Sequence, residues 1–386
     1  MTRSTSGRLS PGRIRVLFVI DSLGPGGAER TLRRVVEFID PTNFECRVAV
    51  LQVREGNSVA DEIRDLGVPV DLVRVDRLRS LAGHARLLRY LLAYRPSIIH
   101  THLEFSHTLG GIYGRLVGAR PIGTIHTFAL GRASREKKRL GLMWFSLRNT
   151  HVKVVAPSRS GMVHAEAVGR IPADRLVVLH NGVDLETFTP DASPRARVRE
   201  ELGIAAGSPL LITVAVLRSG KGINDLVSAM SEILNSIPDA MALIVGDGDE
   251  LVALQRLAGE AGVADRVVFT GSRDDVGVLL SASDVFVLPT HEDLLPTVVA
   301  EAMAAGLPVV ASDVGGLRDM VDEDVTGILY PAGDIPALTQ ACVELLDDSF
   351  RRESLGRAGR LVAQEKFDIR KHVEALQRLY VESSRG

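Results

Sequence analysis

The sequence predicts an α/β protein built from two doubly wound parallel sheets in series, and three observations carry this prediction. Apolar strand-like runs alternate with helical patterns through most of the 386 residues, which is typical of βαβ units. The alternation breaks at 184–203, where Pro, Asp and Ser indicate a linker. Each half has a glycine-rich turn between its first strand and first helix. We therefore expect two domains that face a central cleft, the default ligand site of such sheets.

The first half contains seven strand-like runs. A glycine turn follows the first of them and leads into a helix from about Gly27, and an amphipathic helix is predicted over 80–95. The runs are 13–21, 46–53, 68–75, 97–103, 121–128, 152–158 and 176–184.

The second half repeats the pattern. Its glycine turn is SGKG at 219–222, and its last stretch, 350–383, predicts two amphipathic helices. The strand-like runs are 209–217, 241–248, 266–271, 284–290, 307–313 and 327–331.

Composition excludes several classes of protein. Cys46 and Cys342 stand far apart, which disfavours a disulfide framework or a zinc site and fits a reducing cytoplasm. Residues 1–12 lack an apolar signal core and are expected to form a loose tail. No apolar run reaches the ~20 residues of a membrane span. We therefore expect a cytoplasmic protein.

Charge is distributed unevenly between the halves. Residues 1–188 carry 28 Lys and Arg against 17 Asp and Glu, and residues 189–386 carry 18 against 31. A basic and an acidic half suggest two lobes with different partners. Aromatic residues make up only 4% and do not interleave with the basic ones, so nucleic acid is not expected as a partner.

The glycine turns do not match the common nucleotide motifs. In GPGGAER, Glu29 stands at the third position of a G-x-G-x-x-G fingerprint, which argues against a nicotinamide dehydrogenase. SGKG lacks both the first glycine and the Ser/Thr of a P-loop. Both turns nevertheless open helices, whose free N–H groups suit an anion such as phosphate. The alternative is that Gly26 and Gly27 only permit a tight turn.

An acidic residue on a small-residue helix is the strongest chemical signal. Pro296 suits the first helical position and Gly306 the end, so Glu301 belongs to the second turn of a buried helix. A buried carboxylate needs donors. Magnesium is one option, but a vicinal diol fits better because two hydroxyls can donate to one carboxylate. Asp293 can accept sugar hydroxyls, and the amides of Leu294 and Leu295 can face a phosphate. Together these groups suit a nucleoside diphosphate sugar.

The stretch 290–306 resembles the E-x7-E signature of retaining glycosyltransferases of family four. Further similar motifs occur in the family's order: GGAER, TIHT (124–127), APS (156–158), NGVD (181–184), KG (221–222), VGDG (245–248) and VGGLRDMV followed by TGILYPAGD. The resemblance implies the GT-B fold, with two Rossmann-like lobes. Residues 1–188 would bind the acceptor, 189–368 the nucleotide sugar, and 369–386 would form a helix that crosses back to the first lobe.

The resemblance also implies roles for single residues. Glu301 would hold the ribose diol, Asp293 the donor sugar, and Lys221 the departing diphosphate. His126 would hydrogen-bond the sugar or handle a proton. The remaining donor-binding candidates are Gly26, Gly27, Arg218, Gly246, Glu292, Leu294, Leu295 and Arg273, the last at the end of the segment 267–273 that would lodge the base.

Three positions depart from the family pattern. Asp293 replaces a glutamate, and Glu292 can share its sugar contact. Leu294 replaces a glycine. Val216 stands where an arginine is common, and Arg218 could reach the same phosphates from a shifted register.

These features predict a retaining glycosyltransferase that moves a hexose-type sugar to a cell-envelope glycan or a lipid-linked acceptor. Fixed cationic and amide groups would stabilise the leaving diphosphate. No DxD-type metal pair is evident, so we expect metal independence, and front-face attack by the acceptor is the preferred route. The alternatives are a nucleotide-sugar 2-epimerase of similar fold and a non-catalytic nucleotide-sugar-binding protein.

Two further signals keep open alternatives. His100 and His102 lie on one strand face and are acceptor-side candidates in the cleft, structural histidines, or metal ligands that lack a third partner. The segment 132–148 joins basic residues to Leu140, Met143, Trp144, Phe145 and Leu147. It predicts either peripheral contact with an anionic membrane or an amphipathic helix packed on its own lobe.

Overall fold

The computed structural model describes residues 12–24, 26–53, 58–75, 77–128, 134–190 and 193–385. It divides into two compact units: unit 1 comprises 1–157, 161–179 and 372–386, and unit 2 comprises 158–160 and 180–371. Almost all of the tail expected at 1–12 lies outside the described residues, as do residues 132 and 133 of the basic segment.

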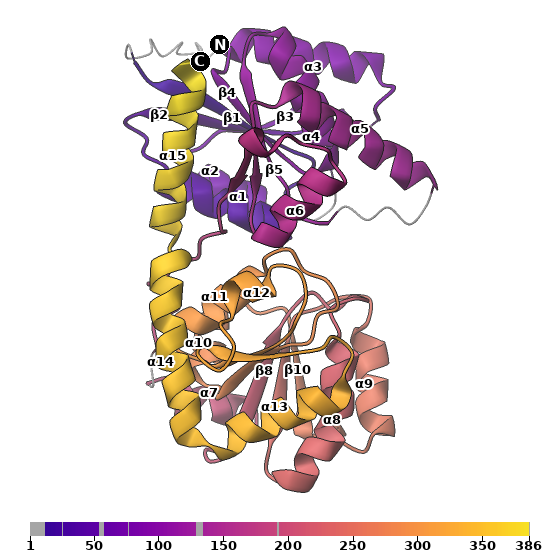
Figure 1. Cartoon of the computed structure of the whole chain (residues 1–386), viewed down its shortest axis with the longest axis vertical. Coiled ribbons are helices and arrows are strands. Elements are labelled where there is room, and N and C mark those ends of the chain that lie inside the picture. The colour runs from indigo at the N-terminus through magenta and orange to yellow at the C-terminus, as the bar shows by residue number, and fades with distance from the viewer. Residues whose placement is uncertain are drawn as a thin grey trace, which may run out of the picture. The chain divides into compact units, whose positions relative to one another are not determined.

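Unit 1 contains a sheet with helices packed around it (Figure 1). The sheet is parallel, and its strand order is β3-β2-β1-β4-β5-β6-β7. The strands are β1 (Ile14–Ile20), β2 (Phe44–Val50), β3 (Val70–Leu72), β4 (Ile98–His102), β5 (Arg120–Thr124), β6 (Lys153–Ala156) and β7 (Leu176–Val178). The connecting helices are α1 (Gly27–Phe38), α2 (Ser58–Asp65), α3 (Leu81–Tyr94), α4 (Glu104–Leu116), α5 (Ser134–Thr150) and α6 (Arg159–Ala167).

The apolar runs of unit 1 become strands because both faces of the sheet are covered by helices, as in other parallel sheets. In β1, Val16 to Ile20 have no exposed surface. The structure thus confirms the seven strands predicted for this half, with shorter bounds at most ends.

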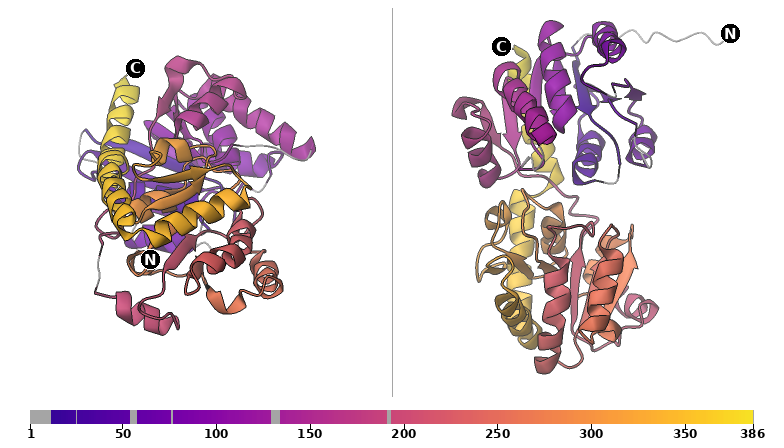
Figure 2. Two further views of the ribbon diagram at one scale, coloured as in Figure 1. Left: turned by 60° about the horizontal axis from the view of Figure 1, so that its bottom comes forward. Right: turned by 90° about the vertical axis from the view of Figure 1, so that its right-hand side faces the viewer.

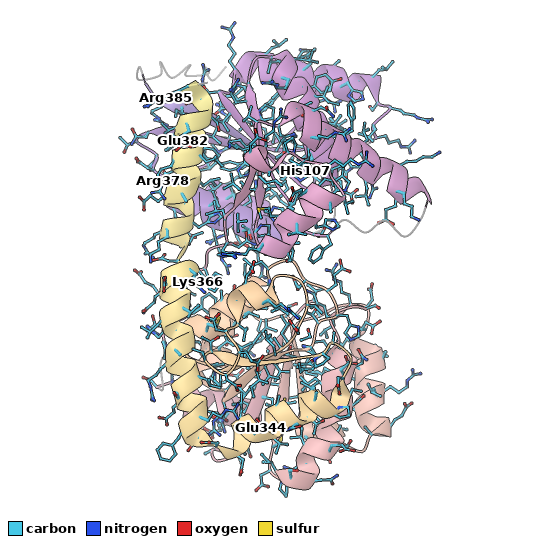
Figure 3. The ribbon with its side chains drawn as sticks, in the orientation of Figure 1. His107, Glu344, Lys366, Arg378, Glu382 and Arg385 are labelled. Carbon is cyan, nitrogen blue, oxygen red and sulfur yellow. The ribbon has the colours of Figure 1, made fainter. Side chains whose placement is uncertain are left out.

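The C-terminal helix α15 (Ile369–Arg385) packs on unit 1 from His372 onward. Its residues Val373, Leu376 and Tyr380 are buried, and the Tyr380 hydroxyl lies 2.6 Å from Nδ1 of His100. Exposed side chains on the other side of the helix include Arg378, Glu382 and Arg385 (Figure 3). The amphipathic pattern of the sequence is therefore used to attach the chain end to unit 1.

Unit 2 contains a second parallel sheet, with the order β10-β9-β8-β11-β12-β13. The strands are β8 (Leu210–Val214), β9 (Met241–Val245), β10 (Val267–Gly271), β11 (Val285–Leu288), β12 (Val309–Ser312) and β13 (Gly327–Tyr330). The helices are α7 (Arg195–Glu201), α8 (Ile223–Ser236), α9 (Leu251–Glu260), α10 (Val276–Ser281), α11 (Thr297–Ala304), α12 (Leu317–Met320), α13 (Ile335–Asp347) and α14 (Ser349–Lys366).

Successive residues of these strands enter two different cores, one on each face of the sheet. Leu210 and Ile212 join the core that includes α10, α11 and the end of α14. Leu211, between them, joins the core of α8, α9 and α13. This is the two-residue period of a strand, and helices flank both faces of the sheet (Figure 2).

Two local expectations were wrong. The linker predicted over 184–203 contains α7, where Arg199 is buried and its guanidinium lies 2.9 Å from Asp284. The charged composition did not indicate this helix, because the residue that it buries against Asp284 is itself an arginine. Pro296 precedes α11 with extended backbone and does not form its first turn.

Each sheet reverses its strand order once, and the loops that meet there can hold a ligand. In unit 1 the reversal lies between β1 and β4, and in unit 2 between β8 and β11. The turns after β1 and β8 are the two glycine turns of the sequence. Among the described residues, no helix combines the length and apolar character needed to cross a bilayer.

Histidines inside unit 1 are expected to make its stability depend on pH. Burial lowers the pKa of His126 and His151 to about 4, with nearby His372 adding to the effect on His126. Burial also places the pKa of His100, His102 and His107 well below the usual 6.5. The unfolded chain therefore binds protons below pH 6.5 that the native unit does not bind until about pH 4. Stability is full above pH 6.5 and is lost as the pH falls toward 4.

The expected loss is large. A pKa lowered from 6.5 to about 4 corresponds to roughly 3 kcal/mol per histidine, and a domain is stable by only about 5–15 kcal/mol. Burial raises the pKa of Asp21, so this residue stabilises unit 1 as the pH falls. Its single contribution opposes those of the five buried histidines. Peptide-resolved hydrogen exchange should show that lowering the pH from 7 to 5 reduces the protection of β4 and β5 more than that of β8 and β9. Equal changes in both sheets would contradict the expectation.

Candidate functional site

The loops at the strand reversal of unit 2 bring Lys221 and Asp293 together. Lys221 follows β8 and Asp293 follows β11, and these two strands are neighbours. Lys221 Nζ lies 2.5 Å from Asp293 Oδ2, and both side chains are mostly buried, with 17% and 16% of their surface exposed. Asp293 Oδ1 accepts a hydrogen bond from the Leu294 amide. The pair places one positive and one negative charge at the carboxyl edge of the sheet.

Several bonds join the two loops into one structure. The His291 amide and the Thr290 hydroxyl both donate to the carbonyl of Gly220. His291 Nε2 lies 2.7 Å from Oδ2 of Asp225 in the first turn of α8. The position of Lys221 relative to Asp293 is therefore fixed by the backbone on both sides.

Gly222 is required where these loops meet. Its φ is +67°, and a Cβ at this position would lie 1.8 Å from the carbonyl oxygen of Pro289. Replacing Gly222 by alanine should displace one of the two loops, lower kcat/KM at least a hundredfold and reduce the free energy of unfolding by about 1–3 kcal/mol.

Steady-state kinetics and urea unfolding check this prediction, with Gly259→Ala as the matched control. Gly259 lies in α9 with open space around its Cβ position, and alanine there should be neutral or slightly stabilising. Wild-type turnover in Gly222→Ala would contradict the importance of this contact.

The acidic helix contains Glu301 as expected. Glu301 is in the second turn of α11 and only 6% exposed. Leu294 and Leu295, before the helix, are buried, whereas Glu292 is exposed. The Leu294 amide, expected to face a phosphate, donates to Asp293 in this structure, so a phosphate there would replace that bond.

The other candidates of unit 2 differ in their exposure and in the contacts that they make. Arg218 is exposed, and in the described part of the chain its side chain makes no hydrogen bond or ion pair; Val216 is 53% exposed. Gly246 follows β9 at φ +136°, where a Cβ would lie 1.9 Å from the Ala215 carbonyl oxygen. Arg273 pairs with Asp275 at 2.7 Å and Glu201 at 2.9 Å. A base bound beside Arg273 would thus meet a guanidinium already neutralised.

Unit 1 has a pocket of about 460 Å³ at its own strand reversal. Its wall is formed by the loops after β1, β2, β4 and β5 and by residues of α1, α4 and α5. Polar groups dominate the lining, which includes Asp21, Ser22, Glu29, Gln52, Glu104, His107, His126, Thr127 and Arg139.

Asp21 lines this pocket and caps the first turn of α4. Its carboxylate accepts bonds from the Ser106 amide and hydroxyl and from the Phe105 amide, at 2.6–3.0 Å. These donors belong to the first turn of α4, so the carboxylate also meets the positive end of the helix dipole. The preceding residue, Leu103, has φ +72°, a strained conformation that this cap stabilises.

The structure separates the three histidines named from the sequence. His126 lines the pocket, and its Nε2 lies 2.9 Å from Nδ1 of buried His102. His100 bonds Tyr380 through Nδ1 and Thr124 through Nε2, at 2.6 and 2.7 Å. Both of its nitrogens are therefore used within unit 1, which indicates a structural role for His100. His102 is not among the residues that line the pocket, but it is hydrogen-bonded to His126, which is.

Gly26 and Gly27 begin helix α1. Gly26 has ordinary extended backbone, and its Cβ position would meet the carboxylate of Glu29 at 2.3 Å. Space around Gly27 is open. Glu29 is 9% exposed and lines the pocket, so an acidic side chain stands at this helix terminus, where phosphate was one expectation.

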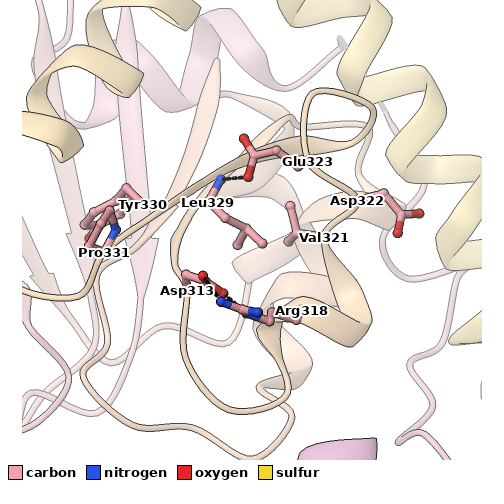
Figure 4. Close-up of a pocket in the computed structure, with 8 residues that line it drawn as sticks. All are labelled: Asp313, Arg318, Val321, Asp322, Glu323, Leu329, Tyr330 and Pro331. Atoms are coloured by element: carbon pink, nitrogen blue, oxygen red, sulfur yellow. Dashed lines mark hydrogen bonds and ion pairs between the residues drawn. The ribbon is translucent and has the colours of Figure 1, made fainter.

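A second hollow, of about 450 Å³, is lined by residues of the segment between β12 and β13, by the end of β13 and by Pro331 (Figure 4). Arg318 pairs with Asp313 within it, and Glu323 accepts a bond from the Leu329 amide. Asp313 and Arg318 thus neutralise each other, and the residues that line the hollow include none of the candidate residues.

Sequence reasoning missed Asp21, Glu104 and the pair of Asp225 with His291. Asp21 directly follows a buried strand, and the rule that ligands meet the carboxyl ends of parallel strands could have identified it. Asp225 and His291 are 66 residues apart in the sequence, and no local pattern indicates a contact between them.

Comparison with known families identifies both halves of the chain. Residues 25–187 match the family model described as Glycosyltransferase Family 4, and residues 194–362 match the model described as Glycosyl transferases group 1. The two matches meet near the boundary predicted from the linker.

Individual relatives agree with these matches. The chain is 27% identical to the UDP-Gal:alpha-D-GlcNAc-diphosphoundecaprenol alpha-1,3-galactosyltransferase of Escherichia coli, over 83% of this chain and 84% of that protein. It is 34% identical to the 2-deoxystreptamine N-acetyl-D-glucosaminyltransferase of Streptomyces fradiae, over 67% and 64%. HepE of Anabaena, solved with UDP-glucose, has the same fold (TM-score 0.86, 20% identity, 96% and 100% coverage). The chain therefore belongs to glycosyltransferase family four and is a glycosyltransferase with the GT-B fold.

Proposed function

We propose that this glycosyltransferase moves a hexose-type sugar from a nucleoside diphosphate sugar to a cell-envelope glycan or a lipid-linked acceptor, with retention of configuration. The observation that carries the proposal is the Lys221–Asp293 pair at the strand reversal of unit 2, together with the buried Glu301 in the helix α11 that follows Asp293. The name of the Escherichia coli relative, which includes a nucleotide sugar and a lipid diphosphate acceptor, supports it.

The pair suits a ligand that brings an anion and hydroxyl groups together. Lys221 and Asp293 are mutually neutralised in the free protein. A diphosphate alone would draw Lys221 away and leave the mostly buried carboxylate of Asp293 without its cation, which is costly. A nucleotide sugar supplies the diphosphate to Lys221 and sugar hydroxyls to Asp293, so both groups stay paired. The Glu301 carboxylate would accept hydrogen bonds from the two ribose hydroxyls.

The reaction follows from these contacts. The bond between the anomeric carbon and the phosphate oxygen breaks, while the acceptor oxygen bonds to the same carbon from the same face. The acceptor proton passes to the departing phosphate oxygen. Lys221 stabilises the charge that grows on the diphosphate, which lowers the barrier because the contact strengthens toward the transition state. The positive charge of Lys221 acts where a metal ion would otherwise serve, and turnover is expected to persist in EDTA.

Nucleotide release by the purified chain tests the proposal. UDP-, GDP- and ADP-sugars are first compared by thermal shift, because a ligand of the folded state raises Tm. Release is then measured with and without glycan and lipid-linked acceptors. Release that requires an acceptor supports the proposal. Release without acceptor, accompanied by an isomerised sugar, would indicate the epimerase, and tight binding with no turnover would indicate a non-catalytic binding protein.

We also propose a peripheral contact between α5 and an anionic membrane. Leu140, Met143, Trp144 and Leu147 are buried in unit 1, so most of the apolar surface of the helix serves its own lobe. Lys138, Leu142 and Phe145 remain exposed, and their spacing of four and three residues places them on one face.

Vesicle sedimentation tests this contact. The protein should bind vesicles that contain anionic lipid, and salt should weaken the binding. Phe145→Glu, which adds a charge to the exposed face, should reduce it severalfold. Binding that is absent, or that neither salt nor this substitution changes, would contradict the contact.

A further inference from the structure

The hydrogen bond between His102 and His126 fixes where the proton of His126 resides. His102 ends β4, and His126 lies two residues after the end of the neighbouring strand β5. The bond joins His102 Nδ1 to His126 Nε2 over 2.9 Å. It leaves one nitrogen on each ring: Nε2 of His102, and Nδ1 of His126, the residue that lines the pocket.

Both imidazoles are neutral near pH 7. Burial, with nearby His372, lowers the pKa of His126 to about 4, and burial with neighbouring His100 and His126 lowers that of His102 well below its usual value. Each ring therefore carries one proton, and only one proton can lie in the bond between them. Two arrangements remain.

In the first arrangement, His102 donates its Nδ1 proton and keeps a bare Nε2, and His126 carries its proton on Nδ1. In the second, His126 donates from Nε2, and His102 must carry its own proton on Nε2. The two arrangements differ in what they bury at Nε2 of His102: a lone pair or an N–H group.

The surroundings of His102 favour the first arrangement. Its side chain is 2% exposed, and its Nε2 has no hydrogen-bond partner among the described residues. The ring packs on Phe18 and His100, with centroids 6.2 and 4.3 Å apart. A buried N–H group without an acceptor is the rarer and costlier of the two defects.

We propose that His102 is a positioning residue that holds His126 in the tautomer protonated at Nδ1, so that His126 offers the pocket a fixed N–H donor. The unprotonated nitrogen of His126, Nε2, then accepts the hydrogen bond from His102 and cannot take a proton from the acceptor. Its role in the reaction, which rests on the proposed function, is to hydrogen-bond an oxygen of the sugar or the acceptor. The tautomer itself is a property of the free protein and can be measured without substrate.

The test is a long-range ¹H–¹⁵N correlation spectrum of the histidine rings in the full-length protein at pH 7. His126→Gln and His102→Asn assign the signals. In the wild type, Nδ1 of both His126 and His102 should have the shift of a protonated nitrogen, and Nε2 of both the shift of a bare one. A proton on Nε2 of His126 would overturn the proposal.

Two substitutions separate positioning from packing. His102→Asn keeps an N–H donor near the position of Nδ1 and should keep the tautomer. His102→Leu removes the donor, should shift His126 toward the Nε2-protonated form, and should lower kcat about tenfold, the effect of one lost neutral hydrogen bond. An unchanged tautomer in His102→Leu would refute the role of His102.

His151→Asn is the matched control. His151 is buried in the same unit and bonds Thr101 and Thr150, but it neither lines the pocket nor bonds His126. This variant should lose stability and retain the tautomer of His126. A protein with the expected tautomer but no transferase activity would count against the proposed function alone.

Discussion

Replacing Lys221 by alanine is expected to lower kcat about a hundredfold or more, with a smaller effect on the KM for the donor. Lys221 is ion-paired with Asp293 at the candidate site, and a fixed donor that meets a growing negative charge contributes on the order of 10²–10³ in rate. The substitution also leaves Asp293 without its cation, which weakens donor binding only modestly because sugar hydroxyls can then pair with the carboxylate. Steady-state and single-turnover kinetics separate the two effects.

The matched control for Lys221→Ala is Arg256→Ala. Arg256 is a 75% exposed cation of α9 in the same unit, and its loss should change neither kinetic parameter. If Lys221→Ala turned over like the wild type while remaining folded, Lys221 would not act on the leaving group. Arg218→Ala, tested in parallel, measures whether this exposed arginine supplies the charge that is missing at Val216.

Replacing Glu301 by glutamine is expected to weaken donor binding tenfold or more with little change in kcat. Hydrogen bonds to a charged group contribute about 1.5–3 kcal/mol, and the ribose hydroxyls take no part in bond breaking, so their contribution is uniform binding. Calorimetric titration with the nucleoside diphosphate measures the loss. Glu344 lies on α13 (Figure 3) and pairs with Arg351. Glu344→Gln, which removes this carboxylate, should leave binding unchanged.

A 2′-deoxy nucleotide makes this prediction specific to the diol. The wild type should bind the deoxy compound more weakly than the ribose compound. Glu301→Gln should show a much smaller difference, because the interacting partner is already lost; this is the logic of a double-mutant cycle. Additive losses would mean that Glu301 and the ribose do not interact.

The sequence predicted most of the fold because the fold depends on repeated local patterns. Apolar runs such as 241–248 and 307–313 became β9 and β12, and the alternation of Leu210, Leu211 and Ile212 between two cores is the two-residue period of a strand. The linker prediction failed at α7 because Arg199 is buried against Asp284, 85 residues away. An arginine is normally exposed, but Arg199 is buried here, and its burial can be recognised only once its contact with Asp284 is known.

The candidate site was predictable to the extent that it follows strand ends. Lys221 and Asp293 stand after neighbouring strands, so the doubly wound order alone brings them together. The tautomer of His126 and the cap that Asp21 provides to α4 were not predictable. Both depend on side-chain contacts between segments 24 and 85 residues apart, whose geometry is set by packing.

The most direct test of the central claim is a crystal structure with the nucleotide sugar that raises Tm most. The account predicts both ribose hydroxyls within hydrogen-bond distance of the Glu301 carboxylate, and Lys221 Nζ on the diphosphate in place of its bond to Asp293. A ribose bound away from Glu301, or a Lys221–Asp293 pair that persists beside the bound diphosphate, would contradict it.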